Sequence, residues 1–293
     1  MIRAAPPLTT DGIAGEIDHA RSRGPLQQIV IPPCPALLTR LQQALALAEP
    51  DLGEVARIAS SDVAMSAVLI RQASGAQFAG FAPAQTVGQA MTRLGLTQTA
   101  ALMTGFLARQ SIRADSPHLQ GFWERSGQRA VVLDGLARQM PDLSPDLAHT
   151  FGLFLHVGMP VLLQSFRSYA GTIVEGQARR DRTFVQTENA NHRTDHAVVG
   201  ALVARVWRLA PTVMGAIRLH HDLASLGDSS IEPEVHTLVA AGLVAEHLLR
   251  RHQGLDAEAD WVQHGAQALA WLHAGPEDLQ DWEHTLLPLL EAA

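Results

Sequence analysis

The stretch that most constrains the fold is residues 148–166, AHTFGLFLHVGMPVLLQSF, which is apolar around almost its whole circumference. A run of this kind predicts one continuous central helix in the core of an all-helical protein. Ser144, Pro145 and Asp146 precede it and supply a capping hydroxyl, a proline at the first helical position and a carboxylate near the positive helix end. His156 places an imidazole in the middle of the run, where it is either a hydrogen-bonded core residue or a ligand.

The basic residues exclude several kinds of chemistry. All 22 of them are arginine, and a chain without lysine has no Walker-A phosphate loop, no Schiff-base nucleophile and no lysine general base. The net charge of −7 and the single tyrosine argue against a nucleic-acid surface, which requires a basic stripe. The possibilities that remain are a site that uses histidine side chains and a protein without catalytic chemistry.

The single cysteine and the length of the apolar runs bear on the compartment. Cys34 has no second cysteine with which to form an internal disulfide. A chain without disulfides is typical of a cytoplasmic protein. No apolar run approaches the roughly 20 residues that a membrane span needs, so we expect no membrane insertion. Residues 1–12 contain no continuous hydrophobic segment of the kind found in secretory signals.

Caps, prolines and glycines predict helices along the rest of the chain and no strand. Thr86 precedes a helix that ends at Gly95, where glycine adopts the left-handed C-terminal geometry. The glycine-rich loop 74–83 carries Phe78 and Phe81, which we expect to plug it onto the core. The other expected helices cover residues 12–21, 35–49, 55–59, 63–73, 97–112, 117–140, 169–180, 196–209, 211–222, 234–251, 257–273 and 276–290.

Further histidines follow His156 at helix ends. His196 lies at the start of one expected helix, and His220 and His221 lie at the end of the next. Imidazoles from three helices of one bundle can converge, and three neutral imidazoles can hold a transition metal. The alternative is that each is an ordinary core or surface residue, because a chain with 14 histidines places some of them in apolar runs by chance. Spacing alone leaves both interpretations open.

Several blocks of the chain resemble, in order, the HDOD (HD-related output) domains of bacterial signalling proteins. The blocks are PPCPAL (32–37), LGEVARIAS (52–60), SDVAMSA (61–67), RQASGA (71–76), VGQAMTRLG (87–95), FWERS (122–126), LHVG (155–158), HAVVG (196–200) with Trp207, and AIRLHH (216–221). The resemblance covers residues 26–228. Many matching blocks in the right order make it specific, unlike a lone motif.

The resemblance implies a distant relation to HD-type metal-dependent phosphohydrolases, including the HD-GYP enzymes that open cyclic di-GMP. Those enzymes use a histidine, a His-Asp pair and further histidines around one or two metal ions. On this chain, Arg125 stands at the position of the first histidine, His156 at the histidine of the pair, and Val157 at its aspartate. The positions that match later ligands are His196 and either His220 or His221.

Two of these replacements oppose hydrolysis. In a two-metal site a carboxylate bridges the ions and positions the attacking hydroxide, and Val157 can do neither. Arg125 would place a permanent positive charge at a ligand position, which opposes a metal ion. The resemblance with these departures predicts a degenerate site without catalytic residues, cofactor or bound metal. If an ion is bound after all, the expected ligands are His156, His196 and His220.

We therefore expect an all-α, HD-like helical bundle made of two abutting helical sub-bundles plus C-terminal helices. The expected domains are an N-terminal arm with a short helix (1–25), an HDOD domain (26–228) and a C-terminal helical extension packed on the core (229–293). The sequence leaves the oligomeric state open, a homodimer included.

The expected function is a non-catalytic output or scaffold module that acts through protein–protein interaction in bacterial signal transduction. No sensor or receiver domain is visible, so the input is expected from a signalling protein partner in trans or from a ligand. Two alternatives stay open. One is a one-metal HD-type phosphohydrolase (a phosphodiesterase or nucleotidase), and the other is a sensor that binds a cyclic dinucleotide through arginines such as Arg125 without cleaving it.

Overall fold

The structure is a computed structural model that describes residues 9–23 and 25–291, and this part of the chain is helical with no strand. The predicted all-α class is therefore confirmed. The chain divides into two compact units. The large unit contains residues up to 32 together with 114–287, and the small unit contains residues 33–113 together with 288 onward. Of the predicted N-terminal arm, residues 1–8 and 24 lie outside the described part.

The small unit is made of helices. They are α2 (Ala36–Leu45), α3 (Leu52–Ser60), α4 (Val63–Gln72) and α5 (Val87–Ser111), with α16 (Pro288–Glu291) near the end of the chain. The side chains of Asp51, Asp62 and Thr86 each accept the backbone N–H three residues further on. Gly95, with φ of 78°, kinks α5, so the two predicted helices on either side of it follow one another in one element.

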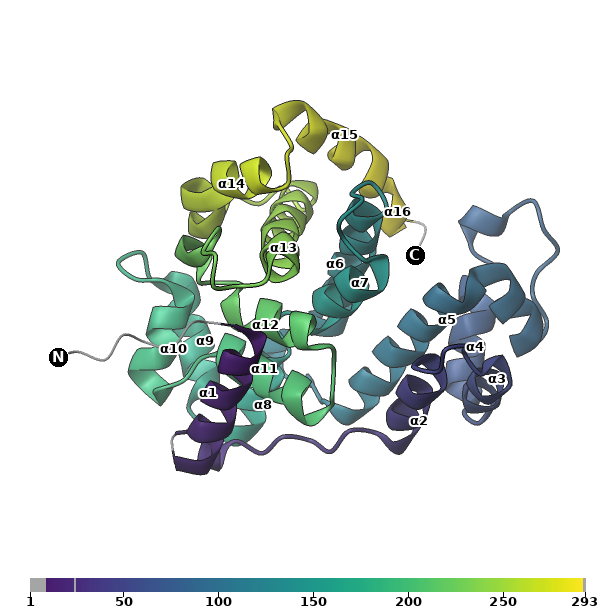
Figure 1. Ribbon diagram of the computed structural model, residues 1–293, viewed down its shortest axis with the longest axis horizontal. Helices are drawn as coiled ribbons and strands as arrows, with labels where there is room; N and C mark the ends of the chain where they lie inside the picture. Colours follow the sequence, from purple (N-terminus) through teal and green to yellow (C-terminus); the bar gives the residue numbers. More distant parts are fainter. Residues whose placement is uncertain (1–8, 24, 292–293) are drawn as a thin grey trace. The chain divides into compact units, whose positions relative to one another are not determined.

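The large unit contains the remaining helices. They are α1 (Thr10–Arg23), α6 (Phe122–Ala137), α7 (Pro145–Phe154), α8 (Gly158–Ser165), α9 (Tyr169–Ala178), α10 (Phe184–His192), α11 (His196–Val206), α12 (Pro211–Leu219), α13 (Pro233–His252), α14 (Ala259–Trp271) and α15 (Pro276–Leu286). Helix α13 packs against both α14 and α6, and α6 packs against α7 (Figure 1). The helix expected from residue 117 begins later, because Pro117–Leu119 is a 3-10 turn and α6 starts only after Gly121.

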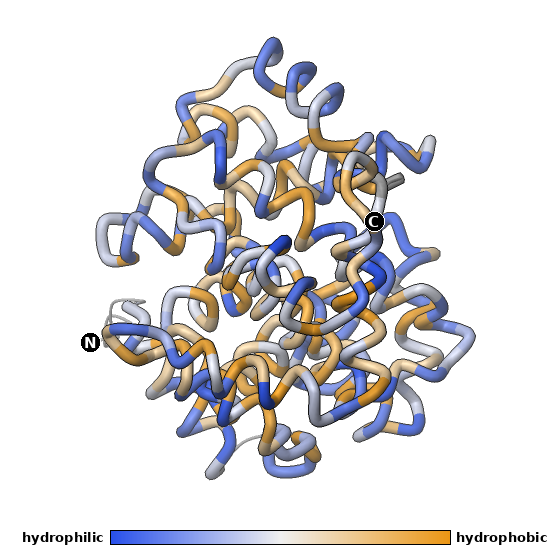
Figure 2. The backbone as a smooth tube through the Cα atoms, turned by 90° about the vertical axis from the view of Figure 1, so that its right-hand side faces the viewer, coloured by the Kyte–Doolittle hydropathy of each residue, from blue (hydrophilic) through white to orange (hydrophobic). Residues whose placement is uncertain are grey.

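Apolar side chains fill the core of the large unit. Along most helices in Figure 2, hydrophobic and hydrophilic residues alternate within each turn, as expected for helices that bury one face. The pair α7 and α8 is buried more completely, since Phe151, Phe154 and Val161 are each fully buried. Each such side chain stabilises the fold by roughly 1.5–3 kcal/mol.

The predicted continuous helix over residues 148–166 is wrong, because α7 and α8 replace it and a short turn joins them. In this turn the N–H groups of Val157 and Met159 each donate, at 2.9 Å, to the carbonyl three residues back rather than four. Pro160 has no N–H for the carbonyl of His156, which explains the tightened backbone. His156 thus lies in a turn between two helices rather than within one.

Glycines hold this turn against α11. A Cβ atom on Gly158 would lie 2.0 Å from the carbonyl oxygen of His196 and 2.8 Å from the backbone nitrogen of Gly200. Side chains do not come this close to backbone atoms, so only glycine permits the approach of α8 to α11. The contact brings the turn that carries His156 beside the first residue of α11.

One segment, Pro145–Ser165, is long and apolar enough to cross a membrane. The expectation that no apolar run reaches this length is therefore wrong. The segment is the pair α7 and α8, and 61% of its most apolar window is buried inside the fold. Burial of this kind is typical of core helices in globular proteins.

Candidate functional site

Four histidine side chains meet in the large unit, and we call them the histidine cluster. His156 lies in the turn between α7 and α8, His196 begins α11, and His220 and His221 directly follow α12. One ligand nitrogen from each lies within 4.8 Å of the other three. Within the described part of the chain, this is the group of side chains arranged to hold a metal ion. The structure thus brings together the histidines that the sequence singled out, including both members of the adjacent pair.

Helix ends position these side chains. Asp195 caps α11 by accepting the N–H of Val198 at 2.9 Å, which fixes the helix start at His196. Pro211 occupies the first turn of α12, and that helix ends at Leu219, directly before the histidine pair. The caps and the proline therefore place three imidazoles at helix ends, where the backbone turns and the side chains can face a common centre.

The inner nitrogens of the histidine cluster approach one another closely. His156 Nδ1 and His221 Nε2 each lie 3.2 Å from His196 Nε2. The ring centroids of His220 and His221 are 4.1 Å apart. His220 Nε2 is buried and has no hydrogen-bond partner, which is costly for a polar atom.

The outer nitrogen of each ring contacts an acceptor. The pairs are His196 Nδ1 with Glu188 Oε2 (2.7 Å), His221 Nδ1 with Asp260 Oδ2 (2.8 Å), His220 Nδ1 with the carbonyl oxygen of Ile217 (2.7 Å) and His156 Nε2 with Glu246 Oε1 (3.2 Å). Outer partners of this kind orient metal-ligating histidines and decide which ring nitrogen is free.

Glu188 is the most enclosed of these acceptors. It lies on α10, which begins with a reciprocal capping box between Thr183 and Gln186, and its side chain is fully buried. The hydroxyl of Tyr169 donates to its other carboxylate oxygen. Burial, reinforced by Glu188, raises the pKa of the Tyr169 hydroxyl well above its ordinary value, so the tyrosine remains a donor.

The arginine beside the histidine cluster is Arg129, which pairs with Glu246, rather than Arg125. Arg125 is exposed, and its guanidinium donates to the carbonyl of Gln120 at 2.8 Å. Arg129 is 5% exposed, forms an ion pair with Glu246 and donates to the carbonyl of Gly152 at 3.2 Å. The predicted placement of Arg125 at the site is thus corrected, because four residues along α6 correspond to about 6 Å of helix axis.

Val157 contributes no ligand atom to the histidine cluster. Its side chain is fully buried, and its Cγ1 lies 3.7 Å from where a Cβ on Gly200 would be. The position that the resemblance assigns to an aspartate is therefore an apolar contact between the α7–α8 turn and α11.

Burial and nearby charges decide the protonation of the cluster. Burial and the positive charge of Arg129 lower the pKa of His156 to about 3, and burial lowers the pKa of His220 well below its ordinary value. Burial also acts to lower the pKa of His196, but Glu188 outweighs it and the net shift is upward. Burial acts to raise the pKa of Glu246, yet Arg129 brings it below the ordinary range. His156 and His220 are therefore neutral at neutral pH, and Glu246 is ionised.

The metal-free protein is expected to lose stability as the pH falls below about 6.5. In the unfolded chain His156 and His220 bind protons at that pH, whereas the folded chain keeps them neutral. The unfolded state then binds more protons, so each histidine lowers the free energy of unfolding by up to about 1.4 kcal/mol per pH unit. The pKa of His196 is raised, so protonation of this residue stabilises the folded chain as the pH falls. That gain in the free energy of unfolding is complete below the ordinary pKa of histidine, and it adds nothing at lower pH.

Urea unfolding of chelator-treated protein across the range from about pH 7.5 to 5 measures this loss. The variant His220→Gln should show a shallower decline than the wild-type chain, because one of the imidazoles that burial keeps neutral is gone. A free energy of unfolding that stays constant over this range would contradict the prediction.

Sequence reasoning missed the outer acceptors and the buried arginine. Glu246 did leave a signal, since it is the one carboxylate in the apolar stretch LVAAGLVAEHLL of α13. Glu188 lies in a polar segment for which no helix bounds are predicted from the sequence, and α10 forms there. Asp260 and Arg129 give no comparable signal, because each resembles an ordinary helix-surface residue in the sequence.

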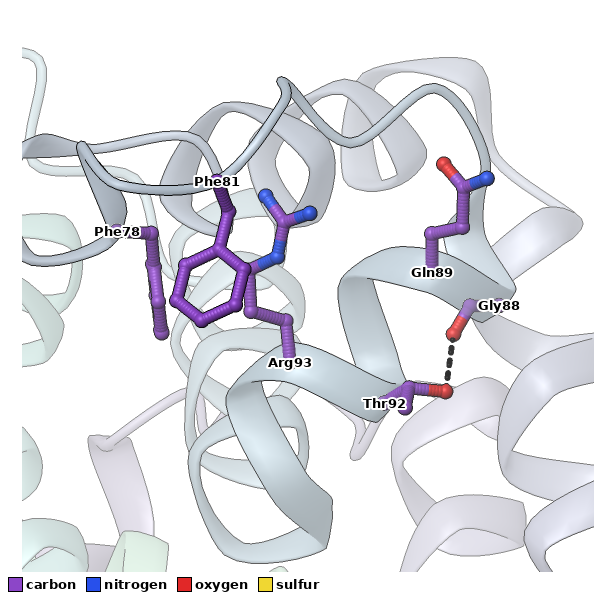
Figure 3. Close-up of a pocket in the computed structure, with 6 residues that line it drawn as sticks. All are labelled: Phe78, Phe81, Gly88, Gln89, Thr92 and Arg93. Carbon is purple, nitrogen blue, oxygen red and sulfur yellow. Dashed lines mark hydrogen bonds between the residues drawn. The ribbon is translucent and has the colours of Figure 1, made fainter.

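A separate hollow of about 650 Å³ opens in the small unit (Figure 3), lined by Phe78, Phe81, Gly88, Gln89, Thr92 and Arg93. The Arg93 guanidinium lies 5.9 and 5.3 Å from the ring centroids of Phe78 and Phe81 and donates to the carbonyls of Ala73 and Ala82. Phe81 is 66% exposed, so the expectation that it plugs the loop onto the core is wrong. The hydrogen bonds of Arg93 hold the loop in place instead.

Comparison with known protein families shows to which family this chain is related. A family model described as HDOD domain matches residues 31–223. The chain belongs to the HDOD domain family. The family that the sequence blocks indicated is therefore confirmed.

Solved structures share the HDOD fold. An HDOD domain protein of unknown function from Geobacter sulfurreducens is 16% identical, with a TM-score of 0.75 over 96% of this chain and 97% of that one. A candidate signal transduction protein from Marinobacter aquaeolei VT8 is 18% identical, with a TM-score of 0.74 over 97% of this chain and 64% of that one. A candidate phosphohydrolase from Shewanella amazonensis SB2B is 19% identical, with a TM-score of 0.68 over 94% and 93%. At these identities the likeness concerns the fold alone.

Among curated proteins, an uncharacterized protein of Treponema pallidum (strain Nichols) is 24% identical over 220 residues. The match covers 74% of this HDOD protein and 42% of the relative. The chain thus spans less than half the length of that relative.

Proposed function

We propose that this HDOD protein is a cytoplasmic signal-transduction module that acts through protein–protein interaction and does not hydrolyse phosphoesters. The observation that carries the proposal is the chemistry at the centre of the histidine cluster. Among the described residues, four imidazoles meet there without a carboxylate, and the residue after His156 is a buried valine. The solved relative described as a candidate signal transduction protein supports the signalling part.

The nearby carboxylates do not replace the missing one. Glu188 and Asp260 each face the outer nitrogen of an imidazole, away from the centre. Glu246 is engaged by His156 and by Arg129. Two-metal hydrolysis needs an oxygen ligand that bridges the ions and positions the attacking water, and no group is arranged for that role in the described part of the chain.

Purified protein supplied with Mn²⁺, Fe²⁺ or Zn²⁺ is expected to release no product from cyclic di-GMP or from a chromogenic phosphodiester. An HD-GYP phosphodiesterase treated in the same way serves as the positive control. Turnover that disappears in His156→Ala and persists in His252→Ala, an exposed histidine on α13, would overturn the proposal.

The proposed protein–protein interaction is tested by a separate measurement. Cross-linking in the native cell followed by mass spectrometry of purified complexes is expected to show one signalling protein reproducibly attached to defined residues of this chain. A chain that is recovered unlinked under conditions that link known bacterial signalling pairs would contradict it.

A one-metal phosphohydrolase is the second candidate, and the histidine cluster itself favours it. Catalysis at a single ion requires three protein ligands and one position left open for water, so in this candidate one of the four imidazoles does not bind the ion. The turnover assay above decides between the two candidates, because only the hydrolase releases product.

A further inference from the structure

We propose that the histidine cluster is a mononuclear, four-coordinate site for a divalent transition-metal ion of the Zn²⁺ type, and that the ion has a structural role. The sequence favours no bound metal, and the hydrogen bonds around the four rings lead to the opposite conclusion. The proposal stands apart from the proposed function, since a structural ion is compatible with a module that interacts without turnover.

The outer contacts fix the tautomer of every ring. An ionised carboxylate or a carbonyl oxygen can only accept a hydrogen bond, so the ring nitrogen that faces it carries the proton. A neutral imidazole has one N–H, and its second nitrogen is then a lone pair. The lone pairs assigned in this way are His196 Nε2, His221 Nε2, His220 Nε2 and His156 Nδ1.

These lone pairs point at one another. His196 Nε2 lies 3.2 Å from both His156 Nδ1 and His221 Nε2, and neither contact has a proton left to occupy it. The buried Nε2 of His220 has no partner. One extra proton could lie between a single pair of nitrogens and would leave the other contacts repulsive. A cation at the centre converts all four lone pairs into bonds.

The separations suit one ion. Zn–N bonds of about 2.0–2.1 Å at the tetrahedral angle place ligand nitrogens about 3.3–3.4 Å apart. Two of the separations here are 3.2 Å, and the four nitrogens lie within 4.8 Å of one another. Two ions in one site lie about 3.5–4 Å apart, and four nitrogens this close together do not enclose both.

The surrounding charges match a divalent ion. Glu188, Asp260 and Glu246 contribute three negative charges just outside the imidazoles, and Arg129 contributes one positive charge. Asp195, which is 7% exposed, adds a further negative charge beside His196. Negative charge therefore exceeds positive charge around the imidazoles, and a divalent ion offsets an excess that would otherwise destabilise the fold.

The donor set selects the kind of metal. Imidazole nitrogen suits Zn²⁺, Cu²⁺ and Ni²⁺, whereas Mg²⁺, Ca²⁺ and Mn²⁺ prefer carboxylate and water oxygen. The set departs from the histidine-and-carboxylate set that the resemblance to HD enzymes implies. Four protein ligands leave no position for water, as in structural zinc sites. The ion would therefore tie the α7–α8 turn, the start of α11 and the end of α12 together.

The test loads chelator-treated wild-type protein with Zn²⁺ and measures bound metal by elemental analysis and native mass spectrometry. One ion per chain is expected, together with a rise in the midpoint of thermal unfolding on loading. Loading with Co²⁺ instead is expected to give the visible absorption of four-coordinate cobalt. None of these measurements depends on enzymatic activity.

Two variants test the assignment at its more open side, where His221 and Asp260 are 24% and 26% exposed. His221→Ala is expected to lose the four-coordinate cobalt spectrum. Asp260→Asn is expected to weaken Zn²⁺ binding by about 10–100-fold, because the outer acceptor loses its charge. His252→Ala is the matched control and should bind like the wild-type chain.

Three results would each overturn the proposal. They are a folded wild-type chain that retains no Zn²⁺, a chain that binds two ions, and equal binding by His221→Ala and the wild-type chain. Circular dichroism shows whether each variant is folded. Hydrolysis of cyclic di-GMP by the loaded protein would instead overturn the proposed function, and the structural role with it, while the stoichiometry and the ligands would stand.

Discussion

Replacing Gly158 with alanine is expected to lower the free energy of unfolding of the large unit by at least about 4 kcal/mol, or to prevent its folding. The added Cβ would lie 2.0 Å from the carbonyl oxygen of His196 and 2.8 Å from the backbone nitrogen of Gly200. Both neighbours are backbone atoms of α11, so α8 and α11 must separate to admit the methyl group. Separation would also move His156 away from His196.

Urea unfolding followed by circular dichroism measures the change, and Gly127→Ala on α6 is the matched control. Nothing lies within 4 Å of a Cβ at Gly127, and alanine is the better helix former by about 0.5–1 kcal/mol. The control should therefore unfold at an equal or higher urea concentration. A Gly158→Ala variant with an unchanged midpoint would show that α8 and α11 do not touch as described.

Replacing Arg129 with methionine is expected to cost about 3 kcal/mol. Arg129 is 5% exposed and pairs with Glu246, and its loss leaves that carboxylate without its strongest partner in a mostly buried position. The carbonyl of Gly152 loses a donor as well. Breaking a buried pair costs more than the pair is worth, because the remaining charge stays desolvated.

The double variant Arg129→Met with Glu246→Met should recover much of this loss, since both charges are then absent. Arg138→Met is the control directly after the same helix, where a 58%-exposed arginine pairs with Asp134. Such a pair contributes about 1 kcal/mol or less. Equal destabilisation by Arg129→Met and Arg138→Met in urea unfolding would contradict the buried role of Arg129.

Much of the helical framework follows from local signals in the sequence. Asp62, Thr86 and Asp195 cap helices at the positions that their chemistry predicts, because a cap depends on the residues of one turn. The central run was misjudged for a related reason. Its apolar composition is compatible with one helix or two, and the break depends on Pro160 and on the approach of Gly158 to a segment about 40 residues away.

The candidate site was predictable only in its inner residues. Histidines at helix ends are visible in a sequence, and the structure brings His156, His196, His220 and His221 together. The carboxylates that face their outer nitrogens come from α10, α13 and α14, and no spacing rule connects those helices to the histidines. Arg125 was placed at the site by block matching, whereas Arg129 is the residue that the packing of α6 buries. Charge complementarity of this kind becomes visible only when separate helices are seen side by side.

The start of α1 has a consequence for synthesis of the chain on the ribosome. The backbone N–H and the hydroxyl of Thr10 both bond to Glu232, which is 222 residues further along. At roughly 5–20 residues per second, α1 emerges roughly 10–45 s before this partner does. Helix α1 also packs on α11 and α12, which emerge shortly before Glu232. The apolar side chains of Ile13 and Ile17, fully buried in the finished fold, are therefore expected to be open to chaperones on the nascent chain for most of that interval.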